Sequence, residues 1–130
     1  MPPSKPGAPI ALGCAPAGDV YDLPTALVEL VLRECGWNAT SLGSSLPLST
    51  ILAAIKEHRP RLFWLSVSYI ANEEQFVSDC AELYAATAGQ TALVVGGRAL
   101  TEPIRRRMQF AAFGDNLRHL EAIAATLSPH

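Results

Sequence analysis

The sequence predicts an α/β fold with one doubly wound, five-stranded parallel sheet and helices on both faces. Short apolar runs alternate with helical patterns along the whole chain, and right-handed crossovers between such runs give a parallel sheet. The chain has 130 residues, 49% of them hydrophobic, which suits one packed core. The common order for five such strands is 2-1-3-4-5. We expect residues 1–8, rich in proline, to be a flexible tail or linker and residues 9–128 to form the domain.

The first expected strand, at residues 8–14, is apolar throughout, which is typical of a strand buried on both faces. A helix is expected at 25–35, because polar residues recur there every four positions. Its expected polar stripe is Thr25, Glu29 and Arg33, and its expected sheet-facing residues are Ala26, Leu27, Leu30 and Val31. Gly36 ends this helix.

The second strand is expected at residues 37–42, where the imperfect alternation suits an edge position. The next helix, Leu48–His58, has an apolar stripe and stops before Pro60. Residues 62–65 form a short apolar strand. The remaining elements are a helix capped by Asn72 and followed by Gly89, a strand at 92–95, a short helix at 103–108, a weaker strand at 110–113 and an amphipathic helix at 117–127.

Composition excludes several classes of protein. The net charge of −2 is too small to indicate a nucleic-acid surface, and no apolar run approaches the ~18 residues of a membrane span. Cys14, Cys35 and Cys80 are far apart and form no CxxC pair, which argues against disulfides and zinc. Each lies in an apolar pattern and is expected to behave as a buried hydrophobic residue. A reducing cytoplasm is the natural location.

Three polar or glycine-rich loops are expected to meet at one edge of the sheet. In the order 2-1-3-4-5 the first, third and fourth strands are adjacent, and residues 18–24, 66–68 and 96–97 follow them. Ligands of open α/β sheets bind at this carboxyl edge. Each loop alone has an ordinary explanation as a turn or a cap, but three converging loops favour a ligand site.

These loops have the spacing of a known set of motifs. Residues 19–24 read Asp-Val-Tyr-Asp-Leu-Pro, residues 66–68 read Ser-Val-Ser, and residues 96–97 are both glycine. The chain therefore resembles, from Ile10 to Leu127, the flavodoxin-like family of cobalamin (vitamin B12)-binding domains. That family has Asp-x-His-x-x-Gly, Ser-x-Leu and Gly-Gly at these places. The run at 96–100 and the Gly114-Asp115 turn resemble versions fused to MerR-type regulators and related light or redox sensors.

The resemblance implies a set of cofactor-binding residues. They are Gly18, Asp19, Val20, Tyr21, Asp22, Leu23, Pro24, Ser66, Val67, Ser68, Gly96, Gly97, Arg98, Gly114 and Asp115. In the family the motif aspartate hydrogen-bonds a histidine that ligates cobalt, and here Tyr21 replaces that histidine. Pro24 replaces the glycine that opens a path for the nucleotide tail, and Ser68 replaces the leucine. Ser66, which touches the tail in the family, is present.

Three interpretations remain open at this point. A cobalamin binds without histidine ligation, with Tyr21 or water below the metal; heme or another tetrapyrrole binds; or the pocket is degenerate and the domain acts through protein contacts. His119 is the one spare candidate for a metal ligand, because it is expected near the ligand edge. His58 and His130 are expected at a solvated helix end and at the terminus.

The expected function is that of a sensory or regulatory domain and not of an enzyme. In the family, cobalamin enzymes pair this domain with a separate catalytic barrel, for which this chain has no room. A response regulator would need an aspartate where Ser66 stands, and a flavodoxin would need a phosphate loop in place of Ala15-Pro16-Ala17. The resemblance implies an upstream DNA-binding or helical-bundle domain, a partner protein or a second copy of the chain as partners. Arg105-Arg106-Arg107 is expected to be a solvated face, without direct nucleic-acid binding.

Overall fold

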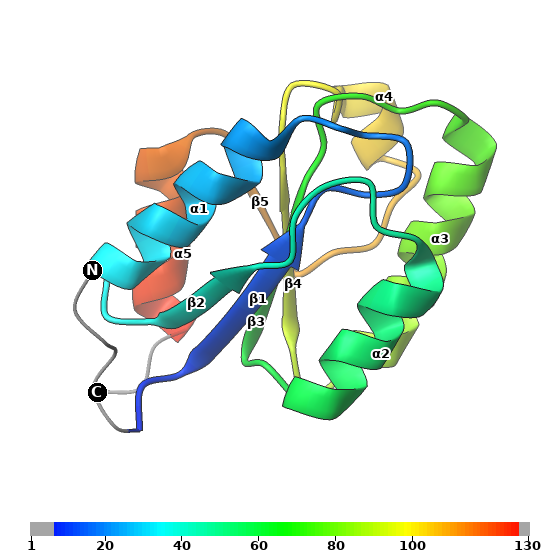
Figure 1. Ribbon diagram of the computed structural model, residues 1–130. Helices are drawn as coiled ribbons and strands as arrows, with labels where there is room; N and C mark the ends of the chain where they lie inside the picture. Colours follow the sequence, from blue (N-terminus) through cyan, green and yellow to red (C-terminus); the bar gives the residue numbers. More distant parts are fainter. Residues whose placement is uncertain (1–6, 128–130) are drawn as a thin grey trace.

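The computed structural model describes residues 7–127, with five strands alternating with five helices (Figure 1). The strands are β1 (Ile10–Cys14), β2 (Asn38–Ser41), β3 (Leu62–Ser66), β4 (Ala92–Gly96) and β5 (Ala112–Gly114). The helices are α1 (Asp22–Glu34), α2 (Leu48–His58), α3 (Glu73–Thr87), α4 (Glu102–Arg105) and α5 (Leu117–Leu127). Most of the predicted tail at 1–8, the predicted domain end at 128 and His130 lie outside the described residues.

All strand pairs of the sheet are parallel, and the order is β2-β1-β3-β4-β5. The predicted fold class and strand order are therefore confirmed, with β2 at one edge as expected. Helices α1 and α5 cover one face of the sheet and α2 and α3 cover the other (Figure 1). The carboxyl ends of β1, β3 and β4 point to the same edge, at the top of Figure 1, so their loops lie together.

The core is centred on β3, in which every residue is buried. Its side chains alternate between the two faces, as the strand geometry requires. Phe63 and Leu65 pack with residues of α2 and α3, whereas Leu62 and Trp64 pack with residues of α1 and α5. Each face of the sheet thus has its own hydrophobic cluster.

Most helix ends follow the sequence signals. Asn72 caps α3 by accepting a hydrogen bond from the Gln75 amide at 3.0 Å. Gly36 follows α1 with a φ of +94°, a conformation that glycine adopts without strain. Helix α1, however, begins at Asp22 rather than at residue 25, because Tyr21 is the N-cap and Pro24 lies in the first turn, where proline needs no amide hydrogen. Helix α4 is shorter than predicted, and β5 lies two residues further on at its start.

The predicted orientation of α1 is wrong. Thr25 is buried, whereas Leu27 and Leu30 are 38% and 41% exposed. The Thr25 hydroxyl accepts a hydrogen bond from Trp64 Nε1 at 2.8 Å and pairs with the Ser41 hydroxyl at 2.9 Å. A buried indole N–H without a partner would cost free energy, so this polar contact turns the threonine toward the sheet. Apolar side chains of α1 therefore remain on the surface.

The cysteines are only partly as predicted. Cys14 and Cys80 are buried, and burial raises the pKa of each thiol to about 12. Cys35 is exposed, contrary to the prediction, because it is the C-cap residue of α1 and lies beyond the sheet-covering part of the helix. Partial burial and the nearby carboxylates of Glu121 and Glu34 raise the pKa of its thiol. Among the described helices, none combines the length and the apolar character of a membrane span.

These environments predict unequal thiol reactivity. A raised pKa lowers the thiolate fraction at pH 8, and only the thiolate attacks a disulfide reagent. We expect one thiol, Cys35, to react slowly with Ellman's reagent in the folded protein, and all three to react in denaturant. In Cys35→Ser the folded protein should not react. Fast reaction of a second thiol in the folded state would contradict the burial of Cys14 and Cys80.

Candidate functional site

Asp19 is the centre of the loops at the carboxyl edge. It follows β1 and is fully buried. Its Oδ1 accepts a hydrogen bond from the Tyr21 amide at 3.1 Å, and its Oδ2 accepts from the amides of Ser68 at 2.6 Å and Tyr69 at 3.1 Å. A buried carboxylate needs such partners. Asp19 therefore joins the loop after β1 to the loop after β3, and its carboxylate oxygens are directed to backbone amides.

The loop after β2 is hydrogen-bonded to the loop that contains Asp19. The Gly18 amide donates to the Ser45 hydroxyl at 3.2 Å, and the Ser45 amide donates to the Asp19 carbonyl at 2.8 Å. Ser45 itself has a φ of +53°, which is uncommon for a residue other than glycine. Residues 18–21 are therefore hydrogen-bonded both to the loop after β2 and to the loop after β3, which fixes the backbone that carries the side chains of this loop.

The second glycine of the Gly96-Gly97 pair at the end of β4 is required by the packing of the loops. Gly97 has a φ of +120°, and a Cβ atom there would lie 2.2 Å from the Val67 carbonyl oxygen. The Val67 amide donates to the Gly96 carbonyl at 2.8 Å, and the Ala99 amide donates to the Val67 carbonyl at 3.1 Å. The close approach of the two backbones explains Gly97 without a ligand, and it brings Ser66 next to the glycine pair.

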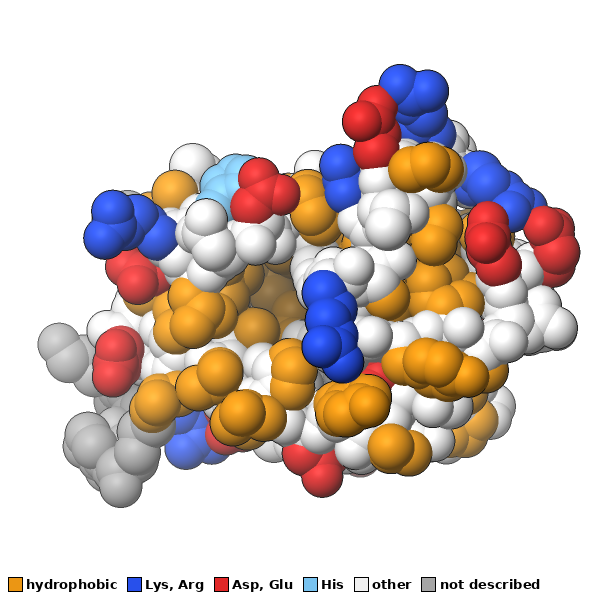
Figure 2. All heavy atoms as spheres, turned by 90° about the horizontal axis from the view of Figure 1, so that it is seen from above, with side chains coloured by type: hydrophobic (Ala, Val, Ile, Leu, Met, Phe, Trp, Pro, Cys, Tyr) orange, Lys and Arg blue, Asp and Glu red, His pale blue; other side chains and the backbone are white. Residues whose placement is uncertain are grey.

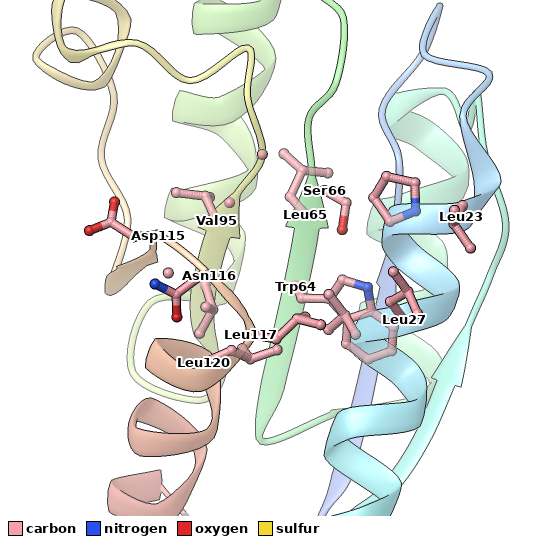
Figure 3. A pocket seen from close by; sticks show the side chains of 16 residues that line it. Leu23, Leu27, Trp64, Leu65, Ser66, Val95, Asp115, Asn116, Leu117 and Leu120 are labelled. Atoms are coloured by element: carbon pink, nitrogen blue, oxygen red, sulfur yellow. The ribbon is translucent and has the colours of Figure 1, made fainter.

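A cavity of about 250 Å³ lies between α1 and α5, against β3 and β4. We call it the slot. In Figure 3 Leu23 and Leu27 of α1 face Leu117 and Leu120 of α5, with Ser66 and Trp64 between them. Seven predicted site residues line the slot: Leu23, Pro24, Ser66, Gly96, Gly97, Gly114 and Asp115. Figure 2, which looks down on the carboxyl edge, shows hydrophobic side chains gathered around a hollow over these two helices.

A wider and more open concavity of about 630 Å³ adjoins the slot. We call it the groove. Its lining consists entirely of predicted site residues: Val20, Tyr21, Asp22, Leu23, Pro24, Ser68, Gly97 and Arg98. Leu23, Pro24 and Gly97 line both spaces, so the groove and the slot meet there. The Arg98 guanidinium lies 5.5 Å from the centre of the Tyr21 ring, a cation–π distance.

The three remaining predicted residues lie outside both spaces. Asp19 and Val67 are fully buried and hold the loops together, and Gly18 lines a separate cavity on the other face of the sheet. His119 also lines neither the slot nor the groove. Its Nδ1 accepts a hydrogen bond from the Asp115 amide at 3.3 Å, at the start of α5. The phenol of Tyr21 is thus the predicted metal ligand that reaches the groove.

The sequence analysis missed the apolar walls of the slot. They come from α1, β3, β4 and α5: Leu27, Val28, Trp64, Leu65, Val94, Val95, Leu117 and Leu120. The polar Asn116, which directly precedes α5, also lines the slot and was missed. Trp64 precedes Ser66 by two positions, so both side chains face the same side of the strand. This alternation is a signal that could have placed Trp64 in the site. A Cβ atom at Gly13 would lie 1.9 Å from the Trp64 ring, so glycine at this position of β1 makes room for the indole.

Two arginines of the basic run at residues 105–107 form ion pairs within the chain. Arg106 pairs with Glu102, and Arg107 pairs with Glu73 at 2.7 Å and Glu74 at 2.6 Å. The two glutamates raise the pKa of Arg107. Within residues 7–127, Arg98 has no such carboxylate partner and is exposed at the groove. The same part of the chain contains no group of three His, Cys, Asp or Glu side chains placed to hold a metal ion.

The fold is of the kind found in cobalamin-binding domains. A cobalamin-binding protein from Desulfitobacterium hafniense DCB-2 has a similar structure, with a TM-score of 0.82 and 18% identity over 93% of this chain and 60% of that one. The methanol:cobalamin methyltransferase complex MtaBC from Methanosarcina barkeri gives a TM-score of 0.78 and 18% identity over 92% of this chain and 46% of that one. At this identity the likeness establishes the fold.

A curated relative links the chain to a regulator. The HTH-type transcriptional repressor CarA of Myxococcus xanthus is 28% identical over 119 residues, which are 91% of this chain and 41% of CarA. The chain thus spans less than half of that relative. No protein-family model matches the sequence. The resemblance to cobalamin-binding domains and to a regulator of this kind, inferred from the three loop motifs, is confirmed by these similarities.

The role of Asp19 predicts a large effect of a small change. In Asp19→Asn an NH₂ group replaces one of the two carboxylate oxygens, both of which accept hydrogen bonds from backbone amides. The new side-chain N–H then faces a backbone N–H, and neither has an acceptor. We expect the free energy of unfolding to fall by about 2–3 kcal/mol, measured by urea denaturation followed by tryptophan fluorescence. Asp22→Asn, which changes an exposed carboxylate in the first turn of α1, is the matched control and should lower it by less than about 1 kcal/mol. Equal effects would show that Asp19 does not hold the loops.

Proposed function

We propose that this chain is a regulatory domain that binds a corrinoid at the carboxyl edge of its sheet and has no catalytic activity of its own. The observation that supports this most is that the groove and the slot adjoin and are together lined by twelve of the fifteen predicted residues. A wide open space and a narrow apolar one suit a ligand with a broad flat part and a flat side group. The similarities to cobalamin-binding domains support the same class of ligand.

The residues of the slot fit a base-bearing tail. The Ser66 side chain forms no hydrogen bond within the described residues, although only 6% of the residue is exposed, and Figure 3 shows its oxygen at the cavity. Gly96, Gly97 and Gly114 present backbone without side chains. Pro24 lies in the first turn of α1 and leaves the slot open, although it replaces the glycine of the family pattern. Ser66 and the glycines would therefore hold the tail.

The residues of the groove fit the broad part of the ligand without histidine ligation. Tyr21 replaces the histidine, and its ring is covered by Arg98. Asp19, which would orient a histidine in the family, accepts three backbone hydrogen bonds instead. We therefore expect Tyr21 or a water molecule below the metal, with Arg98 available for an anionic group of the ligand. When bound, a corrinoid would supply a cobalt centre whose ligands respond to light or redox state.

Regulation would act through the apolar surface beside the site. Val20, Leu23 and Leu27 are 68%, 67% and 38% exposed, and all three line the groove or the slot. A ligand in the groove would contact the same segment that a partner domain or a partner protein would cover, so binding of one changes the affinity for the other. The same exposed surface is the observation that favours the alternative, a protein-interaction domain without a ligand.

Titration of the purified chain tests the proposal. We expect hydroxocobalamin or adenosylcobalamin to remain bound after gel filtration in roughly equimolar amount, and hemin not to remain. Gly114→Leu should weaken binding at least about tenfold, because a Cβ at Gly114 meets only ordinary contacts and the longer side chain fills the slot. Its thermal unfolding should match the parent. Retention of hemin with a ligated Soret band would indicate a heme sensor, and retention of neither pigment would contradict ligand binding.

A change at position 21 tests the metal ligand. In Tyr21→His the imidazole is a far better cobalt ligand than a neutral phenol, so the visible spectrum of bound hydroxocobalamin should shift toward that of an imidazole complex. Tyr21→Phe is the matched control: an unchanged spectrum indicates water below the metal, and a changed one indicates the phenol. If Tyr21→His leaves the spectrum unaltered, position 21 does not lie beneath the metal.

A further inference from the structure

A second cavity lies on the opposite face of the sheet. Its volume is about 300 Å³, and it lies between α2 and α3, below the loops that follow β1 and β3. We call it the back cavity. Its apolar lining is Leu46, Leu48, Ile51, Leu65, Tyr69, Ile70, Phe76, Cys80 and Leu83. The size is at the lower end of the range for small-molecule sites, and the sheet separates it from the slot.

The polar groups of the back cavity are few, and only one of them is a carboxylate. Asn72 Oδ1 is used by the cap of α3, because it accepts from the Gln75 amide. Gln75 Nε2 donates to Asp79 Oδ1 at 2.8 Å, and Asp79 Oδ2 has no hydrogen-bond or ion-pair partner within residues 7–127. The Cys80 thiol is neutral, since burial raises its pKa to about 12.

The charge of the back cavity is therefore negative and uncompensated. No lysine, arginine or histidine lines it, and Asp79 is half-buried, where a carboxylate interacts more strongly with a cation than it does in bulk water. The position is fixed by the helix and by the hydrogen bond from Gln75. An apolar chamber with a single anchored carboxylate at its rim is complementary to a molecule with an apolar body and a cationic head.

We propose that the back cavity is a second ligand site, which binds a small apolar molecule with an amine or amidinium group that pairs with Asp79. The site is a separate space from the groove and the slot, and the proposal does not rest on corrinoid binding. Its roof includes Gly18 and Tyr69, whose amides bond Ser45 and Asp19. A ligand there contacts the same loops that form the groove, so the two sites share a structural element.

Benzamidine is a suitable probe, because its ring fits an apolar cavity and its amidinium can form two hydrogen bonds to one carboxylate. In a titration of the whole chain followed by amide chemical shifts, we expect saturable changes at Phe76, Cys80 and Leu83, with a dissociation constant on the order of 1 mM. Benzamide has the same shape without the charge and should bind about tenfold more weakly. No saturable shifts up to roughly 20 mM, or shifts confined to residues of the slot and groove, would overturn the proposal.

Two variants test whether the carboxylate of Asp79 is the charge that binds benzamidine. Asp79→Asn keeps the shape of the rim and should weaken benzamidine about tenfold, to the level of benzamide. Glu82→Gln removes the same charge from an exposed position of α3 that does not line the cavity, and it should leave the affinity unchanged. An equal loss in both variants would mean that the net charge of the surface, and not Asp79, attracts the probe, and would overturn the assigned site.

Discussion

The arrangement of the carboxyl edge depends on one buried carboxylate. Asp19 accepts hydrogen bonds from three backbone amides of two loops, and its own carbonyl accepts from Ser45 in a third loop. The loops after β1, β2 and β3 are therefore joined to one another through this residue. Since a buried charge without partners is expensive, the folded chain holds these loops in a single arrangement, and the shape of the groove follows from that arrangement.

The slot, in contrast, depends on how α1 is turned. Trp64 donates to Thr25, and Thr25 pairs with Ser41; this chain of contacts orients the helix so that Leu23 and Leu27 face the slot and the solvent instead of the sheet. The cost is a surface with exposed apolar side chains. Exposed apolar patches of this kind often mark interaction sites, and this one lies next to the groove, where the proposed function places both a ligand and a partner.

The features of the fold that were predicted correctly are those that local sequence patterns determine. Strand order, parallel pairing, the cap at Asn72 and the end of α1 at Gly36 follow from short-range signals and from the handedness of crossovers. The orientation of α1 could not be predicted in this way, because apolar residues occupy more than half of its circumference. The orientation depends on the hydrogen bond from Trp64, which is 39 positions away from Thr25. The slot was missed for the same reason: its walls come from four elements, and only their packing brings them together.

The structural role of Asp19 changes the interpretation of the motif at residues 19–24. In the family pattern the aspartate serves a histidine, so its presence beside Tyr21 could be taken as a remnant of metal binding. The three backbone hydrogen bonds give Asp19 a sufficient structural reason that holds with or without a cofactor. The same is true of Gly97, which the Val67 backbone requires. A ligand is instead indicated by groups that the fold does not need. Within residues 7–127 these are the Ser66 hydroxyl without a hydrogen-bond partner, Arg98 without a carboxylate partner, and the joined cavities between them.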